Sequence, residues 1–242
     1  MKITAKTDIG CVYEDNQDYY VAGRLSDDTY WVALCDGMGG VSEGGRASKM
    51  AGEFLKAEIE ARLIDIIAPE TVKGFMLDAV RRCNTKVHDE SIRGEGGGSM
   101  GTTVVLAVIR GNAVYVVHAG DSRAYHLQRR SLKQITRDHS IVQELLDSGK
   151  ISAEQANNHP NKNIITSAVG IDDEIKIDIN EQKLSKGDML LLCSDGLSNM
   201  LTNEEMVETL RDSDFYKTAD ILVKKAIDAG GFDNITAVVL SV

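Results

Sequence analysis

Residues 33–40 read ALCDGMGG, an apolar run that meets a single aspartate and then breaks into glycines. The apolar part is typical of a buried strand, and glycine forms sharp turns that other residues avoid. Asp36 therefore stands where a buried strand enters a turn, and a carboxylate near a core is costly unless something neutralises it. One Asp-Gly pair on its own indicates only a turn. The role of Asp36 thus depends on whether other strand ends carry aspartates in the same way.

Six runs rich in Val, Ile, Leu and Tyr predict strands. They read TYWVALCD, TTVVLAVI, AVYVVHA, SRAYHL, DMLLLCS and NITAVVLSV. Several are separated by Gly-Asn, Gly-Asp or Lys-Gly, which are turn-forming pairs, so hairpins and antiparallel sheets are favoured.

Helical periodicity follows the first glycine turn, over residues 46–67 and again over residues 72–88. Further along, Thr202 and Glu205 form a capping-box pattern, and residues 216–230 have helical spacing that ends at Gly230. A polar insert with helical character spans residues 138–170. Strands that cluster apart from helices are typical of a layered α+β fold.

The composition predicts one globular domain. The chain has 242 residues, 43% of them hydrophobic, without a repeat, a low-complexity tract or a Pro/Ser-rich linker. No stretch approaches eighteen apolar residues and residues 1–10 lack the apolar core of a signal peptide, so we expect a cytoplasmic protein that does not enter a membrane. Four cysteines without CxxC spacing are expected to be buried free thiols. The net charge of −10 argues against a nucleic-acid partner.

Four more aspartates repeat the position of Asp36 beside a β-rich run. They are Asp18 in EDNQDYY, Asp121 in HAGDSRAY, Asp195 in LLLCSDGLSN and Asp233 in GGFDNITAVV. Five carboxylates drawn together near a core are costly unless cations neutralise them. Oxygen ligands without paired histidines or cysteines favour Mg²⁺ or Mn²⁺ over zinc or copper. Two such ions that share a carboxylate lower the pKa of a bridging water, and the resulting hydroxide suits attack on a phosphoryl group.

Six motifs in order, NQD, DGMGG, GTT, GDSR, SDG and DN, resemble those of the metal-dependent serine/threonine protein phosphatases of type 2C in their compact bacterial form. The resemblance runs from Thr7 to the last predicted strand. It implies a four-layer α-β-β-α sandwich, in which two central antiparallel sheets carry helix pairs outside and metals bind in a cleft at one edge. Residues 1–242 are then expected to form a single catalytic domain.

Carried over residue by residue, the resemblance implies two core Mn²⁺ or Mg²⁺ ions bridged by Asp36, with the backbone carbonyl of Gly37 as a further ligand. Asp195 and Asp233 are expected to complete this shell, and Asp18 to act mainly through metal-bound water. These four aspartates are the expected catalytic residues.

The resemblance also implies a third, weaker metal, with Asp121 of the GDSR motif as its ligand and help from Asp195. The glycines of DGMGG receive a role as well. Gly37, Gly39 and Gly40 are expected to let the backbone approach the core ions and turn sharply into the first long helix.

Residues 138–170 resemble the flap of this family, a mobile segment beside the cleft. His139, Ser140 and Asn163 are then candidate contacts for the substrate. The alternative is a helical excursion on the surface without a functional role. His118 lies in a strand-like run and is expected to be a core or edge histidine whose hydrogen bonds are satisfied.

Two positions depart from the pattern of the family. Tyr13 stands where the family carries an arginine that binds the substrate phosphate, and a hydroxyl cannot replace a bidentate guanidinium. Either the metals alone hold the phosphoryl group, or a basic residue such as Arg24, Arg46 or Lys162 reaches in. Met38 stands where animal members carry a histidine, so a metal-bound water or bulk solvent is expected to protonate the leaving oxygen.

The leading hypothesis is a monomeric enzyme that removes phosphate from Ser or Thr of phosphoproteins, opposes a partner kinase and uses a water bridging two metal ions. Two alternatives stay open at this point. A degenerate member would bind phosphoproteins without cleaving them, which the missing arginine favours and the five intact aspartates oppose. A metal phosphodiesterase would share the chemistry but would need a basic surface, which a net charge of −10 does not supply.

Overall fold

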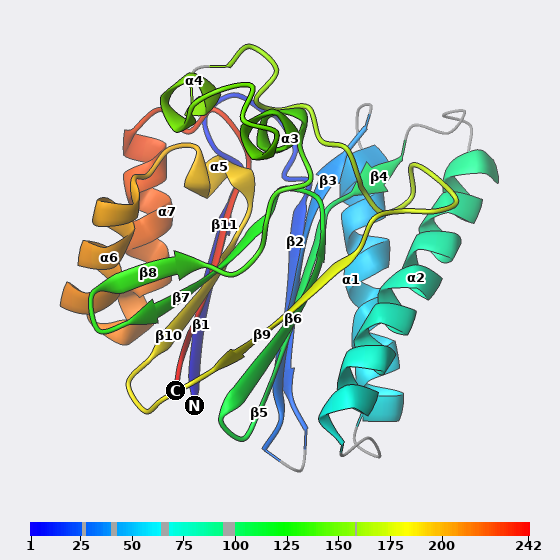
Figure 1. Cartoon of the computed structure of the whole chain (residues 1–242), viewed down its shortest axis with the longest axis horizontal. Coiled ribbons are helices and arrows are strands. Elements are labelled where there is room, and N and C mark those ends of the chain that lie inside the picture. The colour runs from blue at the N-terminus through cyan, green and yellow to red at the C-terminus, as the bar shows by residue number, and fades with distance from the viewer. Residues whose placement is uncertain (26–27, 40–42, 64–67, 94–99, 158) are drawn as a thin grey trace.

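Two antiparallel sheets pack face to face at the centre of the molecule (Figure 1). The computed structural model describes residues 1–25, 28–39, 43–63, 68–93, 100–157 and 159–242. The first sheet consists, in spatial order, of β1 (Lys2–Asp8), β11 (Ile235–Ser241), β10 (Met189–Cys193), β7 (Arg123–Gln128) and β8 (Ser131–Gln134). The second sheet consists of β2 (Asp18–Arg24), β3 (Tyr30–Met38), β5 (Val104–Arg110), β6 (Ala113–Ala119) and β9 (Asp178–Lys183). The short β4 (Gly101–Thr102) pairs with the end of β3.

A pair of helices covers the outer face of each sheet. Helices α1 (Glu43–Arg62) and α2 (Pro69–Arg93) lie against the second sheet, and α6 (Asn203–Asp212) and α7 (Thr218–Asp228) lie against the first (Figure 1). The 3₁₀ turn η2 (Phe215–Lys217) joins the latter two. The short helices α3 (Ile141–Asp147), α4 (Ala153–Asn157) and α5 (Asp195–Ser198) lie at one end of the sheets, at the top of Figure 1. This arrangement confirms the four-layer α-β-β-α sandwich expected from the sequence.

The alternation of side chains along β3 explains the layers. Val32 and Leu34 point into the core between the two sheets, whereas Trp31, Ala33 and Cys35 point into the core beneath α1 and α2. Successive residues of a strand face opposite sides, so a strand that is apolar throughout must be covered on both faces. The apolar run before Asp36 is therefore a central strand, and the aspartate follows directly after it.

The predicted strands all exist, and the two-residue β4 overlaps the start of the predicted run TTVVLAVI, but four further strands of the described chain were not predicted. These are β1, β8, β2 and β9, and they are the two edge strands of each sheet. An edge strand keeps part of its surface in water, and β9 accordingly reads DINEQK and β1 reads KITAKTD. Apolar runs identify central strands and miss such edges.

The helix predictions are confirmed in position and differ at their ends. The helix expected over residues 46–67 is α1, which ends at Arg62, and residues 64–67 lie outside the described part of the chain. The helix expected over 72–88 is α2, which is longer at both ends. The capping box of Thr202 and Glu205 is formed at the start of α6. Gly230, where the last helix was expected to end, has a φ of 134° two residues after α7.

The cysteine prediction is right at three positions and wrong at one. Cys35, Cys83 and Cys193 are free and buried, whereas Cys11 is free and exposed, because it lies in the polar loop between β1 and β2 rather than in a strand. Within the described parts of the chain, no helix combines the length and the apolar character needed to cross a membrane.

The inter-sheet core makes a testable prediction. Leu34→Ala should lower the free energy of unfolding by about 2–5 kcal/mol, because Leu34 is fully buried between the sheets and its removal leaves a cavity. Urea denaturation measures this loss. The matched control is Ile92→Ala on α2, where 61% of the residue is exposed and the change should stay within about 0.5 kcal/mol. Equal losses for the two variants would contradict the assigned layers.

Candidate metal centre

Five strand ends meet at one edge of the two sheets, and each carries one of the aspartates singled out in the sequence. Strands β3, β6 and β10 end at this edge, whereas β2 and β11 begin there. Antiparallel pairing places the end of one strand beside the start of its neighbour. The structure therefore brings together residues from five distant parts of the chain: Asp18, Asp36, Asp121, Asp195 and Asp233.

A cleft of about 320 Å³ opens at this edge. Four of the five aspartates line it, whereas Asp18 does not line it and is buried, with 7% of its surface exposed. The other residues that line the cleft come from the loops around it and from the 138–170 segment: Tyr13, Gln17, Gly37, Met38, Gly39, Thr103, Asn163, Ile165 and Asn234.

Asp18 and Asp36 lie directly opposite each other in the register of β2 and β3. The backbone of Asp36 is fixed by two threonines: its carbonyl accepts from Thr102 Oγ1 at 2.9 Å and from the Thr103 amide at 2.8 Å, and its amide donates to Thr103 Oγ1 at 3.1 Å. These threonines belong to the GTT motif of the sequence. The motif therefore has a structural role, which is to hold the strand end that carries Asp36.

The two oxygens of Asp18 have different surroundings. Oδ2 accepts hydrogen bonds from Ser194 Oγ at 2.7 Å and from Thr236 Oγ1 at 2.6 Å. Oδ1 is buried and has no hydrogen-bond partner among the described atoms. Buried carboxylate oxygens are nearly always paired, so an unpaired one indicates a missing ligand such as an ion or water.

Asn234 ties the loop before β2 to this edge, a role that the sequence analysis did not assign. Its side chain accepts from the Gln17 amide at 2.8 Å and donates to the carbonyls of Ile9 at 2.9 Å and Asp15 at 3.1 Å. Its own amide donates to Asp233 Oδ1 at 2.7 Å. The sequence did point to Asn234, since it is the second residue of the DN motif. Its partners Ile9, Asp15 and Gln17 could not be predicted, because they lie more than 200 residues away along the chain.

The glycines of the DGMGG motif allow the chain to pack closely at this edge. A Cβ on Gly37 would lie 2.1 Å from the Gly44 carbonyl oxygen and 2.7 Å from that of Gln17, so no other residue fits between α1 and the loop before β2. Gly39 has a φ of 145°, which favours glycine. The described contacts show close approach of this turn to α1, and the expected approach to a metal ion stays a prediction. Gly40 lies outside the described residues.

Burial raises the pKa of all five carboxyl groups above the usual 3.8, and like charge adds to the effect for every one of them except Asp233. The pKa of Asp18 and of Asp121 rises to about 6. The pKa values of Asp36 and Asp195 rise well above the usual range through burial and repulsion by the neighbouring aspartates, and that of Asp233 rises through burial. A divalent cation would remove this repulsion, and a set of oxygen donors suits Mg²⁺ or Mn²⁺.

The structure separates the candidate substrate contacts of the 138–170 segment. Asn163 lines the cleft. His139 is 1% exposed and does not line the cleft, so its expected contact with substrate is wrong for this structure. Ser140 caps α3, where its Oγ accepts from the Gln143 amide at 3.2 Å, and it lines a different pocket between α3 and the start of α6.

The basic residues considered as substitutes for the missing arginine lie elsewhere. Arg24 pairs with Asp28, Arg46 pairs with Glu90, and Lys162 lines the pocket beside α3 rather than the cleft. In the described parts of the chain no arginine or lysine lines the cleft.

Comparison with known proteins agrees with this geometry. Residues 13–226 match the family described as Protein phosphatase 2C. The chain is 36% identical over 238 residues to the serine/threonine phosphatase stp of Listeria monocytogenes, which covers 97% of this chain and 93% of the relative. It is 40% identical over 252 residues to the protein phosphatase PhpP of Streptococcus pneumoniae, which covers 100% of this chain and 97% of the relative.

Solved structures of serine/threonine phosphatases superpose closely on this chain. The serine/threonine phosphatase of S. agalactiae superposes with a TM-score of 0.93 at 32% identity, over 100% of this chain and 99% of that chain. The catalytic domain of the phosphatase PstP, solved in complex with two manganese ions, superposes with a TM-score of 0.84 at 33% identity, over 98% of this chain and 96% of that chain. On its motifs, its fold and the aspartates at its strand ends, the chain belongs to the protein phosphatase 2C family.

Proposed function

We propose that the chain is a metal-dependent phosphatase that removes phosphate from Ser and Thr of phosphoproteins. The observation that carries the proposal is the gathering of five aspartates from five strand ends, one of which, Asp18, keeps a buried oxygen that has no partner among the described atoms. Relatives named as serine/threonine phosphatases and a relative that holds two manganese ions support the same reaction.

The oxygen donors at this edge fit two core ions of Mn²⁺ or Mg²⁺. Asp36 and the carbonyl of Gly37 would hold them together with Asp195 and Asp233, and Asp18 would act through water. When bound, such ions supply a hydroxide nucleophile near neutral pH from a shared water and offer positive charge to the phosphoryl oxygens.

A third ion is part of the proposal. Asp121 faces the same cleft and would hold that ion with help from Asp195.

Neutral donors hold the carboxylates without neutralising them. Hydroxyl groups of Ser194 and Thr236 occupy one oxygen of Asp18, and the Asn199 side chain donates to Asp195 Oδ2 at 3.0 Å. Each carboxylate is thereby oriented and stays free to bind a cation. Met38 lines the cleft and carries no ionisable proton, which leaves protonation of the leaving oxygen to solvent.

Tyr13 lines the cleft at the position of the missing arginine and can donate a hydrogen bond to a phosphoryl oxygen. Repulsion by Asp233, burial, and repulsion by Asp195 and Asp36 raise the pKa of its hydroxyl, so it stays protonated and can donate one hydrogen bond. A single neutral donor holds phosphate less tightly than a guanidinium. We infer that the metal ions, more than the chain, hold the phosphoryl group.

The proposal extends to the domain organisation, oligomeric state and cellular setting of the chain. We propose that residues 1–242 act as one catalytic unit, as a monomer in the cytoplasm opposite a Ser/Thr kinase that supplies the substrates. Residues 138–170 would form a flap beside the cleft, and Asn163 and Ile165 of this segment line the cleft.

Activity tests the proposal directly. Mn²⁺ should support hydrolysis of a phosphothreonine peptide and of a small aryl phosphate, EDTA should abolish it, and Asp36→Asn should lower kcat by at least about a hundredfold because it removes the shared ligand. Asp172→Asn, at an exposed aspartate outside the cleft, is the control and should be fully active. Metal binding without turnover would instead identify a phosphoprotein-binding module, and cleavage of phosphodiesters alone would identify a phosphodiesterase.

Metal removal and a change of pH should both act on the buried negative charge of Asp121. Asp121 has a pKa of about 6 in the folded chain and about 3.8 unfolded, so the folded state gains protons that the unfolded state lacks as the pH falls through 6. In EDTA, acidification from pH 8 to pH 5.5 should therefore stabilise the wild type relative to Asp121→Asn in thermal unfolding. At pH 8, Mn²⁺ should stabilise the wild type more than the variant. Parallel pH profiles of the two proteins would refute this account.

Replacing Tyr13 tests how phosphate is held. Tyr13→Arg should lower KM for the phosphopeptide by about tenfold, because a charged donor adds about 1.4 kcal/mol of binding. Val12→Arg adds the same charge at the neighbouring exposed position, which does not line the cleft, and should change KM little. An unchanged KM for Tyr13→Arg would mean that the cleft already binds phosphate by other donors.

A further inference from the structure

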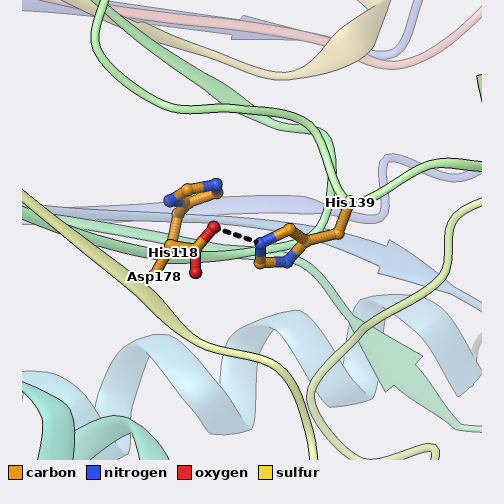
Figure 2. A group of neighbouring side chains, drawn as sticks. All are labelled: His118, His139 and Asp178. Carbon is orange, nitrogen blue, oxygen red and sulfur yellow. Dashed lines mark hydrogen bonds and ion pairs between the residues drawn. The ribbon is translucent and has the colours of Figure 1, made fainter. Parts of the chain in front are cut away.

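A tight trio of side chains lies next to the Asp121 loop and outside the cleft: His118, His139 and Asp178 (Figure 2). His118 on β6 and Asp178 at the start of β9 are paired directly in the sheet register. His139 enters from the start of the 138–170 segment and stacks on His118, with ring centroids 4.7 Å apart. Both histidines are buried, and one nitrogen or oxygen of each residue in the trio lies within 4.8 Å of the others.

Hydrogen-bond partners fix the proton on the His139 ring. The Gly120 amide donates to Nδ1 at 3.3 Å, so Nδ1 carries a lone pair and Nε2 carries the hydrogen. Nε2 donates this hydrogen to Asp178 Oδ2 at 3.0 Å, the dashed contact in Figure 2. A metal at Nε2 would force a hydrogen onto Nδ1, where it would face the Gly120 N–H.

The His118 ring leaves one lone pair free. Its Nε2 lies 2.8 Å from the Arg137 carbonyl oxygen, and this shorter contact makes it the donor, whereas the Arg137 amide approaches the same nitrogen at 3.3 Å. Its Nδ1 is buried without a partner among the described atoms, so the expectation of a fully satisfied histidine is wrong at this nitrogen. One free ring nitrogen beside a single carboxylate is too few ligands for a zinc site. The trio is therefore a hydrogen-bond chain from Gly120 through His139 to Asp178, with His118 stacked against it.

His139 forms hydrogen bonds with both backbone polar groups of Gly120. Its backbone N–H donates to the Gly120 carbonyl at 2.9 Å, and its ring accepts from the Gly120 N–H. Gly120 has a φ of 110°, and a Cβ there would lie 2.6 Å from Thr103 Cγ2, so the loop has little freedom to relax. Without the ring, a buried N–H directly before Asp121 would lose its partner.

The other side of Asp121 is held by separate contacts. Ser122 Oγ lies 2.7 Å from Thr103 Oγ1, and Arg123 forms an ion pair with Asp138 at 2.6 Å. Loss of the His139 ring therefore frees the loop on the Gly120 side alone.

We propose that His139, oriented by Asp178, is a positioning residue for Asp121 and sets the affinity of that aspartate's site for a divalent cation. The inference rests on the proposed role of Asp121 as a ligand of a third ion. Side chains that orient a metal ligand change the affinity for the metal by 10–100-fold when they are removed. Here the orienting contact, from the Gly120 N–H to His139 Nδ1, acts on Asp121 through the backbone of the preceding residue.

Calorimetric titration of the metal-stripped chain with Mn²⁺ tests the proposal without recourse to activity. The wild type should show a weak class of site that Asp121→Asn abolishes. His139→Ala should weaken that class by about tenfold and leave the tighter sites unchanged. The double variant should bind as Asp121→Asn alone does, because both changes act through the same ligand.

Two conservative variants separate the halves of the ring. His139→Asn keeps an acceptor at the place of Nδ1 for the Gly120 amide and should retain most of the weak-site affinity. His139→Gln keeps a donor at the place of Nε2 for Asp178 but no acceptor for Gly120, and it should bind as weakly as His139→Ala. This pair decides the question even where His139→Ala does not fold.

A second buried histidine provides the matched control. His126 on β7 pairs with a carboxylate as His139 does, since its Nε2 lies 2.8 Å from Asp188 Oδ2. Neither His126 nor Asp188 lines the cleft or contacts Gly120 in the described structure. His126→Ala should lower the midpoint of thermal unfolding and leave Mn²⁺ binding unchanged.

Two results would overturn the proposal, and they are distinguishable. If Asp121→Asn loses the weak site while all His139 variants keep it, His139 has no positioning role and the proposed function stands. If Asp121→Asn itself binds Mn²⁺ as the wild type does, the proposed third-ion role of Asp121 fails together with the inference.

Discussion

Repulsion among carboxylates is the interaction on which the rest of this structure depends. Five strand ends converge on one edge of the sandwich and each delivers an aspartate. Burial raises the pKa of all five carboxyl groups, and like charge adds to the rise for Asp18, Asp36, Asp121 and Asp195. Such an arrangement is unfavourable for folding on its own. The two sheets fix where the strands end and so hold the carboxylates together, and a bound cation would restore the free energy that the repulsion removes.

The surroundings of the aspartates show how the chain keeps them available. The contacts described for them come from hydroxyls, amides and backbone groups, such as those of Ser194, Thr236 and Asn234. A lysine or arginine at the same places would neutralise the carboxylates and compete with a metal ion. The described residues that line the cleft include neither, and Tyr13 extends this pattern to the position where the family carries a cation.

Much of the fold and most of the cleft could be predicted from the sequence. Central strands such as β3 are apolar throughout because both faces are covered, and the aspartates stand out against them. The edge strands could not be predicted in this way, since polar side chains such as those of β9 are partly exposed to solvent and form no apolar run. The role of Asn234 was missed and that of His139 was misjudged for another reason: both depend on partners that only tertiary structure brings near. His139 lies in a polar segment and was expected to contact substrate, although it is buried.

Asp18 on the second sheet is held by two hydroxyls from the first sheet, which lie 176 and 218 residues further along the chain. No local fragment and no single sheet can reproduce this contact, so it forms only after β11 has joined its sheet. The candidate metal centre is therefore a property of the complete sandwich, and cations that bind there would stabilise the native state relative to partly folded ones. A chain that is still being synthesised is therefore expected to lack phosphatase activity until β11 has docked, so that incomplete copies are inactive.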